Sequence, residues 1–186
     1  MNNGLKNILT NDTVIVYPTD TIYGLGWLIT PKVVDTINII KQRPPEKHFS
    51  IIAPNSNWVK QYFEVDDDFE NIWNKIKGKY PNRWLTLVIK LKSINKRPSD
   101  INFNLLSHND EIGVRFIDHP LQALISALNK PLITTSANIS GYPPISYLDQ
   151  LTMNQQECID YAIDWSLLNQ PPSMIIRYDN GSIIRW

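Results

Sequence analysis

The feature that most constrains the fold is the alternation of short β-branched runs with stretches of helical periodicity along the chain. Strands are expected at residues 14–17, 51–53, 85–91, 113–116, 132–135, 174–177 and 182–185. Helices are expected at 31–43, 66–76, 120–128 and 147–157. Strands and helices interleaved in this way, without repeats or a linker, predict a single α/β domain over residues 1–186. We expect a twisted mixed sheet with flanking helices.

Prolines and one Asn-Gly pair set the limits of these elements. Pro31 suits the first turn of its helix, and Pro44 with Pro45 prevents that helix from continuing beyond Arg43. Asn180-Gly181 lies between the last two strands, where this dipeptide is a strong signal for a tight hairpin.

Charge and cysteine content exclude several classes of protein. The 18 basic and 18 acidic residues cancel, so any anion-binding site must be local. Cys158 is the only cysteine, which excludes an internal disulfide; we expect it to pack as a small apolar side chain. The three histidines lack metal-ligand spacing, and no protein-ligated metal is expected. Without a signal peptide or a membrane-length apolar run, the sequence predicts a cytoplasmic protein with no membrane contact.

Four polar segments follow buried elements and are candidates for a site: residues 17–26, 41–47, 113–120 and 134–141. Each also has a structural interpretation. The first is a polar loop, the second holds cations that complement a helix C-terminus, and the last is a Ser/Asn turn. Arg115 in the third could pair with Asp118 or with a substrate carboxylate. His119 is expected to cap or pack against the following helix.

The binding interpretation assigns an anion to each cationic segment. Lys41 and Arg43 would converge on a polyphosphate, Arg supplying a planar fork and Lys a point charge. The small donors and exposed backbone of residues 134–141 suit phosphates or a small polar ligand.

Two spaced pairs carry a family resemblance: Lys41-x-Arg43 and the later Ser136-x-Asn138, within Thr-Ser-Ala-Asn-x-Ser-Gly. With these pairs in this order, the chain resembles the YrdC/TsaC family over essentially its whole length, in its short single-domain form. The resemblance implies a YrdC-like fold with a concave basic cleft. It also implies an L-threonylcarbamoyladenylate synthase, a nucleotidyltransferase that makes threonylcarbamoyl-AMP and pyrophosphate from L-threonine, bicarbonate or CO2, and ATP.

The resemblance also assigns residues and partners. It places threonine at Thr21, Arg115, Ser136 and Ser173, and ATP at Lys41, Arg43, Lys47, Asn138, Ser146 and Arg185. Lys41 and Arg43 would be the catalytic residues, offsetting charge on the phosphates. Mg2+ would accompany ATP through its phosphates. The product would pass to the threonylcarbamoyl-transferase complex that modifies tRNA next to the anticodon. The alternative is a module that binds double-stranded RNA or tRNA without synthase activity.

One segment departs from the family pattern. The family sequence Trp-Pro-Gly-Pro-x-Thr is here Tyr-Pro-Asn-Arg-Trp-Leu-Thr, over residues 80–86. The second proline is lost and one residue is inserted, so the loop is expected to differ while Thr86 keeps its place.

Overall fold

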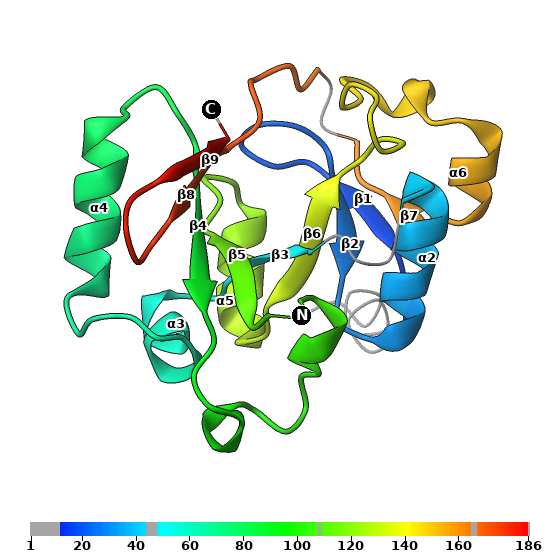
Figure 1. The fold of residues 1–186 in the computed structure, drawn as a ribbon. Helices are drawn as coiled ribbons and strands as arrows, with labels where there is room; N and C mark the ends of the chain where they lie inside the picture. Colours follow the sequence, from blue (N-terminus) through cyan, green and yellow to red (C-terminus); the bar gives the residue numbers. More distant parts are fainter. Residues whose placement is uncertain (1–11, 44–47, 108, 165–166, 186) are drawn as a thin grey trace.

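The computed structural model describes residues 12–43, 48–107, 109–164 and 167–185. Within these residues nine strands form one sheet in the order β7-β1-β2-β6-β3-β5-β4-β8-β9 (Figure 1). The strands are β1 (Ile15–Tyr17), β2 (Gly24–Trp27), β3 (Ser50–Ile52), β4 (Leu85–Lys90), β5 (Glu111–Arg115), β6 (Leu132–Ser136), β7 (Tyr161–Ala162), β8 (Met174–Arg177) and β9 (Ile183–Arg185). The helices are α2 (Pro31–Lys41), α3 (Ser56–Tyr62), α4 (Phe69–Lys79), α5 (Leu121–Leu128) and α6 (Met153–Glu157).

The sheet is mixed, as the sequence predicts. Parallel pairs join β1 to β7, β3 to β5 and β4 to β8, and the remaining neighbours are antiparallel. The chain also closes the expected hairpin, because Gly181 adopts a φ of 70° between β8 and β9 and its N–H donates to Arg177 O at 3.0 Å. The α/β fold with flanking helices is therefore confirmed.

Side-chain alternation divides the strand residues between two faces of the sheet. One face packs against α2, α3 and α4 in the larger core, which contains strand residues such as Leu25, Ile51, Leu87, Val114 and Ile133. The opposite face packs against α5 in a smaller core of Ile15, Tyr17, Trp27, Ile52, Ile117, Leu121, Ile125 and Leu132. The smaller core covers only part of its face, and the rest is open for a site.

Local sequence explains where α2 begins and ends. The Thr30 hydroxyl accepts from Val33 N–H at 3.3 Å, and Pro31 occupies the first turn, where its missing N–H costs nothing. The helix ends at Gln42, which adopts a left-handed conformation with φ of 46°. Val33, Val34, Ile37 and Ile40 form the buried face.

Two smaller predictions are also confirmed. His119 caps α5, since its Nδ1 accepts from Leu121 N–H at 3.2 Å. Cys158 is half-buried and packs against the larger core.

Two expectations from the sequence need correction, and two elements were missed. Residues 24–27 form strand β2 instead of part of a turn, and β7 and α3 were not expected. The expected helix over 147–157 is two pieces, a 3-10 turn at Leu148–Gln150 and the short helix α6. The break has a local cause: the Thr152 hydroxyl accepts from Gln155 N–H at 3.3 Å and starts a new helix there. No helix in the described residues has the length and hydropathy needed to cross a membrane.

Candidate active site

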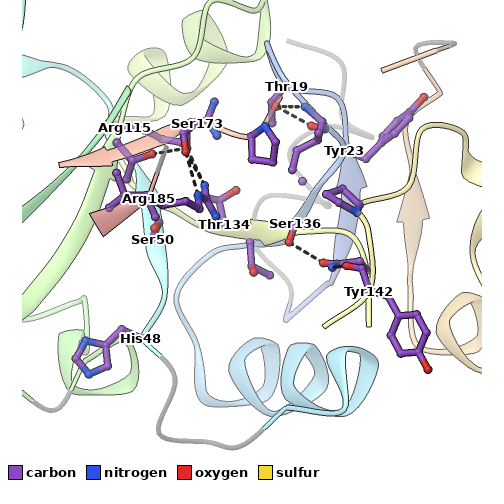
Figure 2. A pocket seen from close by; sticks show the side chains of 18 residues that line it. Thr19, Tyr23, His48, Ser50, Arg115, Thr134, Ser136, Tyr142, Ser173 and Arg185 are labelled. Carbon is purple, nitrogen blue, oxygen red and sulfur yellow. Dashed lines mark hydrogen bonds between the residues drawn. The ribbon is translucent and has the colours of Figure 1, made fainter. Parts of the chain in front are cut away.

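A cavity of about 390 Å³ opens on the sheet face that α5 leaves uncovered. In Figure 2, Arg115, Ser173 and Arg185 lie together at one end of the cavity, and Ser136 and Tyr142 lie at the other. Its wall is formed by Thr19, Ile22, Tyr23, Gly24, His48, Ser50, Thr86, Arg115, Thr134, Thr135, Ser136, Asn138, Tyr142, Pro144, Pro172, Ser173, Ile175 and Arg185. The wall is rich in hydroxyl groups and carries two guanidinium groups.

Strand alternation builds the floor of this cavity. Each of the five central strands contributes a hydroxyl residue or a glycine to the same face: Gly24 from β2, Ser50 from β3, Thr86 from β4, Gly113 from β5 and Thr134 from β6. A methyl group at position 113 would collide with the Ser50 hydroxyl and lie 3.2 Å from Thr86 Cγ2. Glycine at this position therefore makes room for the polar side chains around it.

Arg115 forms a buried ion pair with Asp20, in the loop between β1 and β2. The two side chains are 9% and 1% exposed, respectively. The other carboxylate oxygen, Asp20 Oδ2, accepts from the main-chain N–H of Asp118 at 2.9 Å. The alternative in which Asp118 pairs with Arg115 is therefore wrong: the backbone amide of Asp118, and not its carboxylate, takes part, through Asp20. Arg115 Nε is buried without a hydrogen-bond partner among the described residues, and the side chain as a whole lines the cavity.

Ser173 links the Arg115 end of the cavity to the C-terminal hairpin. Its hydroxyl lies 2.8 Å from Thr86 Oγ1, and its carbonyl accepts from Arg185 Nη2 at 2.7 Å. Burial, together with the nearby charges of Arg115 and Arg83, lowers the pKa of Arg185. Thr86 thus lies in the cavity wall, at the end of the altered segment over residues 80–86.

Lys41 organises the opposite end. Its ammonium, at the C-terminus of α2, donates to Ser136 O at 2.6 Å, to Asn138 Oδ1 at 2.8 Å and to Asn138 O at 3.1 Å. The Ser136 hydroxyl also donates to Asn138 Oδ1, at 2.6 Å. The Lys-x-Arg and Ser-x-Asn pairs, far apart in sequence, therefore meet through Lys41. The side chain of Lys41 lies behind Ser136 and Asn138 and is not part of the cavity wall.

Other residues assigned by resemblance lie outside the wall. Arg43 stacks over the Phe49 ring at 3.6 Å and donates from Nε to Asn38 Oδ1 at 2.9 Å, and burial lowers its pKa to about 10. Thr21 lies beneath the wall, 3.5 Å from Arg115 Nη2. Ser146 donates its main-chain N–H to Gln150 at 2.6 Å. Lys47 lies outside the described residues.

Five of the assigned residues do line the cavity: Arg115, Ser136, Asn138, Ser173 and Arg185. Sequence reasoning missed His48, Ser50, Tyr142 and Ile175. Ser50 carried a usable signal, because it is the polar residue in an otherwise apolar strand and alternates with Ile51. Among the described residues, no three His, Cys, Asp or Glu side chains are grouped so as to hold a metal ion.

Comparison with known proteins identifies the family. The family model Sua5_yciO_yrdC, described as "Telomere recombination", matches residues 7–185. This chain belongs to the Sua5/YciO/YrdC family. Among curated relatives of this family member, the threonylcarbamoyl-AMP synthase of Haemophilus influenzae is 28% identical over 97% of this chain and 91% of the relative.

Solved structures of the family share the fold. Escherichia coli YciO matches with a TM-score of 0.78 and 25% identity, over 98% of this chain and 87% of that one. The Sua5 of P. abyssi, complexed with L-threonine, matches with a TM-score of 0.74 and 20% identity. That comparison covers 96% of this chain and 51% of Sua5.

Proposed function

We propose that this family member is an L-threonylcarbamoyladenylate synthase, an enzyme of the nucleotidyltransferase class. The observation that carries the proposal is the composition of the cavity wall. The Arg115 guanidinium and several hydroxyl groups line it, and Lys41 holds Ser136 and Asn138 in place at the other end. The two ends of the cavity suit an amino acid and a nucleotide. Relatives named threonylcarbamoyl-AMP synthase, and the Sua5 complex with L-threonine, support the same substrates.

Threonine would occupy the end of the cavity at Arg115. The Arg115 guanidinium is a cation in the cavity wall, and a carboxylate is the ligand that matches it. Ser136 and Ser173 line the same cavity, and Thr21 supports Arg115 from below.

ATP would occupy the end at Asn138 and Tyr142, with Arg185 reaching its phosphates. Lys41 and Arg43 would offset charge on the phosphates, as the family resemblance implies. Mg2+ carried by the phosphates would add further charge compensation.

The reaction needs positioning more than acid–base machinery. The threonine amine would combine with bicarbonate, releasing water, to give a carbamate. A carbamate oxygen would then attack the α-phosphorus of ATP, forming the acyl phosphate bond as the bond to pyrophosphate breaks. Because the carbamate is already an anionic nucleophile, holding the reactants in line can supply about 7–11 kcal/mol in favourable cases. The product would then serve tRNA modification in the cytoplasm.

A turnover measurement tests the proposal. The purified protein is incubated with ATP, bicarbonate and each of several amino acids, and both pyrophosphate and threonylcarbamoyl-AMP are measured. We expect both products to depend on threonine and bicarbonate together. Salt-sensitive binding of duplex RNA without any threonine-dependent turnover would favour a binding module and overturn the proposal.

A further inference from the structure

Most hydroxyl groups in the cavity already have protein partners. Thr86 and Ser173 bond each other, Ser136 donates to Asn138, and Thr19 donates to Ile22 O at 2.6 Å. In contrast, the hydroxyl of half-buried Ser50 lines the cavity without a hydrogen-bond partner among the described residues. A serine hydroxyl can both donate and accept one hydrogen bond, so Ser50 is equipped for a ligand.

The strand register places Ser50 near Arg115. Ser50 is paired with Gly113 across β3 and β5, and Ile52 is paired with Arg115. Ser50 and Arg115 therefore lie on one face, two residues apart along the strand direction, which is about 6.7 Å. Figure 2 shows both side chains at the same end of the cavity.

Gly113 leaves bare backbone between these two side chains. A methyl group there would overlap the Ser50 hydroxyl, so no side chain separates Ser50 from a ligand lying on the sheet. A small amino acid whose carboxylate is held by Arg115 would therefore extend its side chain over Gly113 towards Ser50.

The cavity contains three other hydroxyls to weigh against Ser50. Thr134, paired with Ser50 across β3 and β6, shares a side-chain hydrogen bond with Tyr17, and the Tyr142 side chain is exposed. Thr135, like Ser50, lacks a hydrogen-bond partner among the described residues. It is paired with Leu25, whose side chain packs in the larger core, whereas Thr134 contributes to the cavity floor. Thr135 thus alternates away from the face that carries Arg115.

We propose that Ser50 determines substrate specificity by hydrogen-bonding the side-chain hydroxyl of the amino-acid substrate. This inference rests on the proposed function, because it takes threonine as the substrate. A site that bonds a substrate hydroxyl rejects the analogue lacking it, since the polar group of the protein is left unpaired. Ser50 would supply that discrimination.

The test compares two ligands with two proteins. L-threonine and L-2-aminobutyrate, which differ by the hydroxyl alone, are titrated calorimetrically into the wild type and Ser50→Ala. We expect the wild type to prefer threonine. In Ser50→Ala, threonine affinity should fall about five- to tenfold while 2-aminobutyrate affinity stays unchanged. Ser93→Ala, a remote serine without a side-chain capping bond, is the matched control and should change neither affinity.

Other outcomes would contradict either the specificity role of Ser50 or the proposed function. Equal loss of both ligands in Ser50→Ala would indicate general damage to the cavity and reject the specificity role. Unchanged preference in Ser50→Ala, or preference lost only in Thr135→Val, would also overturn it. Thermal unfolding of each variant checks that the fold is intact. If the wild type binds no threonine, the proposed function itself fails; threonine binding with an unaltered preference in Ser50→Ala fails only this inference.

Discussion

At the residue scale, the pair formed by Arg115 and Asp20 joins two distant parts of the chain. Arg115 ends β5, and Asp20 lies in the loop after β1, and both side chains are almost fully shielded from water. Removing one member of a buried pair leaves the other charge uncompensated, which costs more than the pair itself contributes. Asp20 therefore fixes both the conformation of the loop after β1 and the orientation of the Arg115 guanidinium.

Asp20→Asn should lower the free energy of unfolding by about 3 kcal/mol and weaken threonine binding, because Arg115 loses its anionic partner. Chemical denaturation and calorimetry measure the two effects. Asp118→Asn is the matched control, since only its main-chain N–H contacts Asp20. If Asp20→Asn and Asp118→Asn changed the free energy of unfolding and threonine binding equally, the Arg115–Asp20 pair would contribute to neither.

Variants of Lys41 and Arg43 should show which of the two side chains contributes to stability as well as to turnover. Lys41→Met and Arg43→Ala are both expected to lower pyrophosphate release by about 100-fold, the scale of one lost charge-stabilising donor. Lys41→Met should also lower the melting temperature markedly, because Ser136 and Asn138 lose their shared donor. Near-normal turnover in both variants would contradict the assigned phosphate site.

At the element scale, local patterns predict most strands and helices but not β2. Residues 24–27 contain two glycines, which are depleted in strands, so the sequence favours a turn there. The strand forms because of tertiary packing: a methyl group at Gly26 would overlap the carbonyl oxygen of Ile133 in β6. Glycine alone does not distinguish a turn from a strand whose backbone lies close to its neighbour, because it is common at both.

Gly26→Ala should therefore destabilise the protein by about 1–3 kcal/mol, because β2 and β6 would have to separate. Urea denaturation measures the loss. Gly78→Ala provides the opposite case: Gly78 is exposed in α4 with no atom within 4 Å of the added methyl, so this variant should gain about 0.5–1 kcal/mol. Equal changes in the free energy of unfolding for Gly26→Ala and Gly78→Ala would contradict the explanation that close packing requires glycine at position 26.

At the scale of the whole molecule, a salt bridge across the sheet couples stability to pH. Arg177 in β8 donates to both carboxylate oxygens of Glu111 in β5, at 2.5 and 2.9 Å, spanning β4 between them. The hydrogen bonds from Arg177 lower the pKa of Glu111. The stabilisation is therefore complete above the unfolded pKa of about 4.3 and disappears as the pH falls through the lower folded value.

Glu111→Gln should consequently lower the melting temperature at pH 7, with the difference from the wild type vanishing near pH 2. Melting curves over this pH range provide the measurement. Lys90→Gln, which removes an exposed ion pair with Glu64, is the control and should have little effect at any pH. A difference for Glu111→Gln that persists at pH 2 would show that packing, and not charge, is responsible.

Part of the candidate site could be predicted from the sequence. Arg115, Ser136 and Asn138 could be placed in one cavity because each belongs to a recognisable motif. The partner of Arg115 could not be predicted, because Asp20 is 95 residues away and meets it only through the strand order. Ser50 was missed for the same reason: β3 lies between β5 and β6, and nothing local reveals these neighbours.

The alternation of the five central strands has an evolutionary consequence. Residues that hold the molecule together and residues that face the ligand occupy different positions of the same strands. Mutations at the ligand-facing positions can change which small molecule is accepted while the apolar packing on the far side is preserved. A fold built in this way can acquire new substrates by small steps, without first losing its ability to fold.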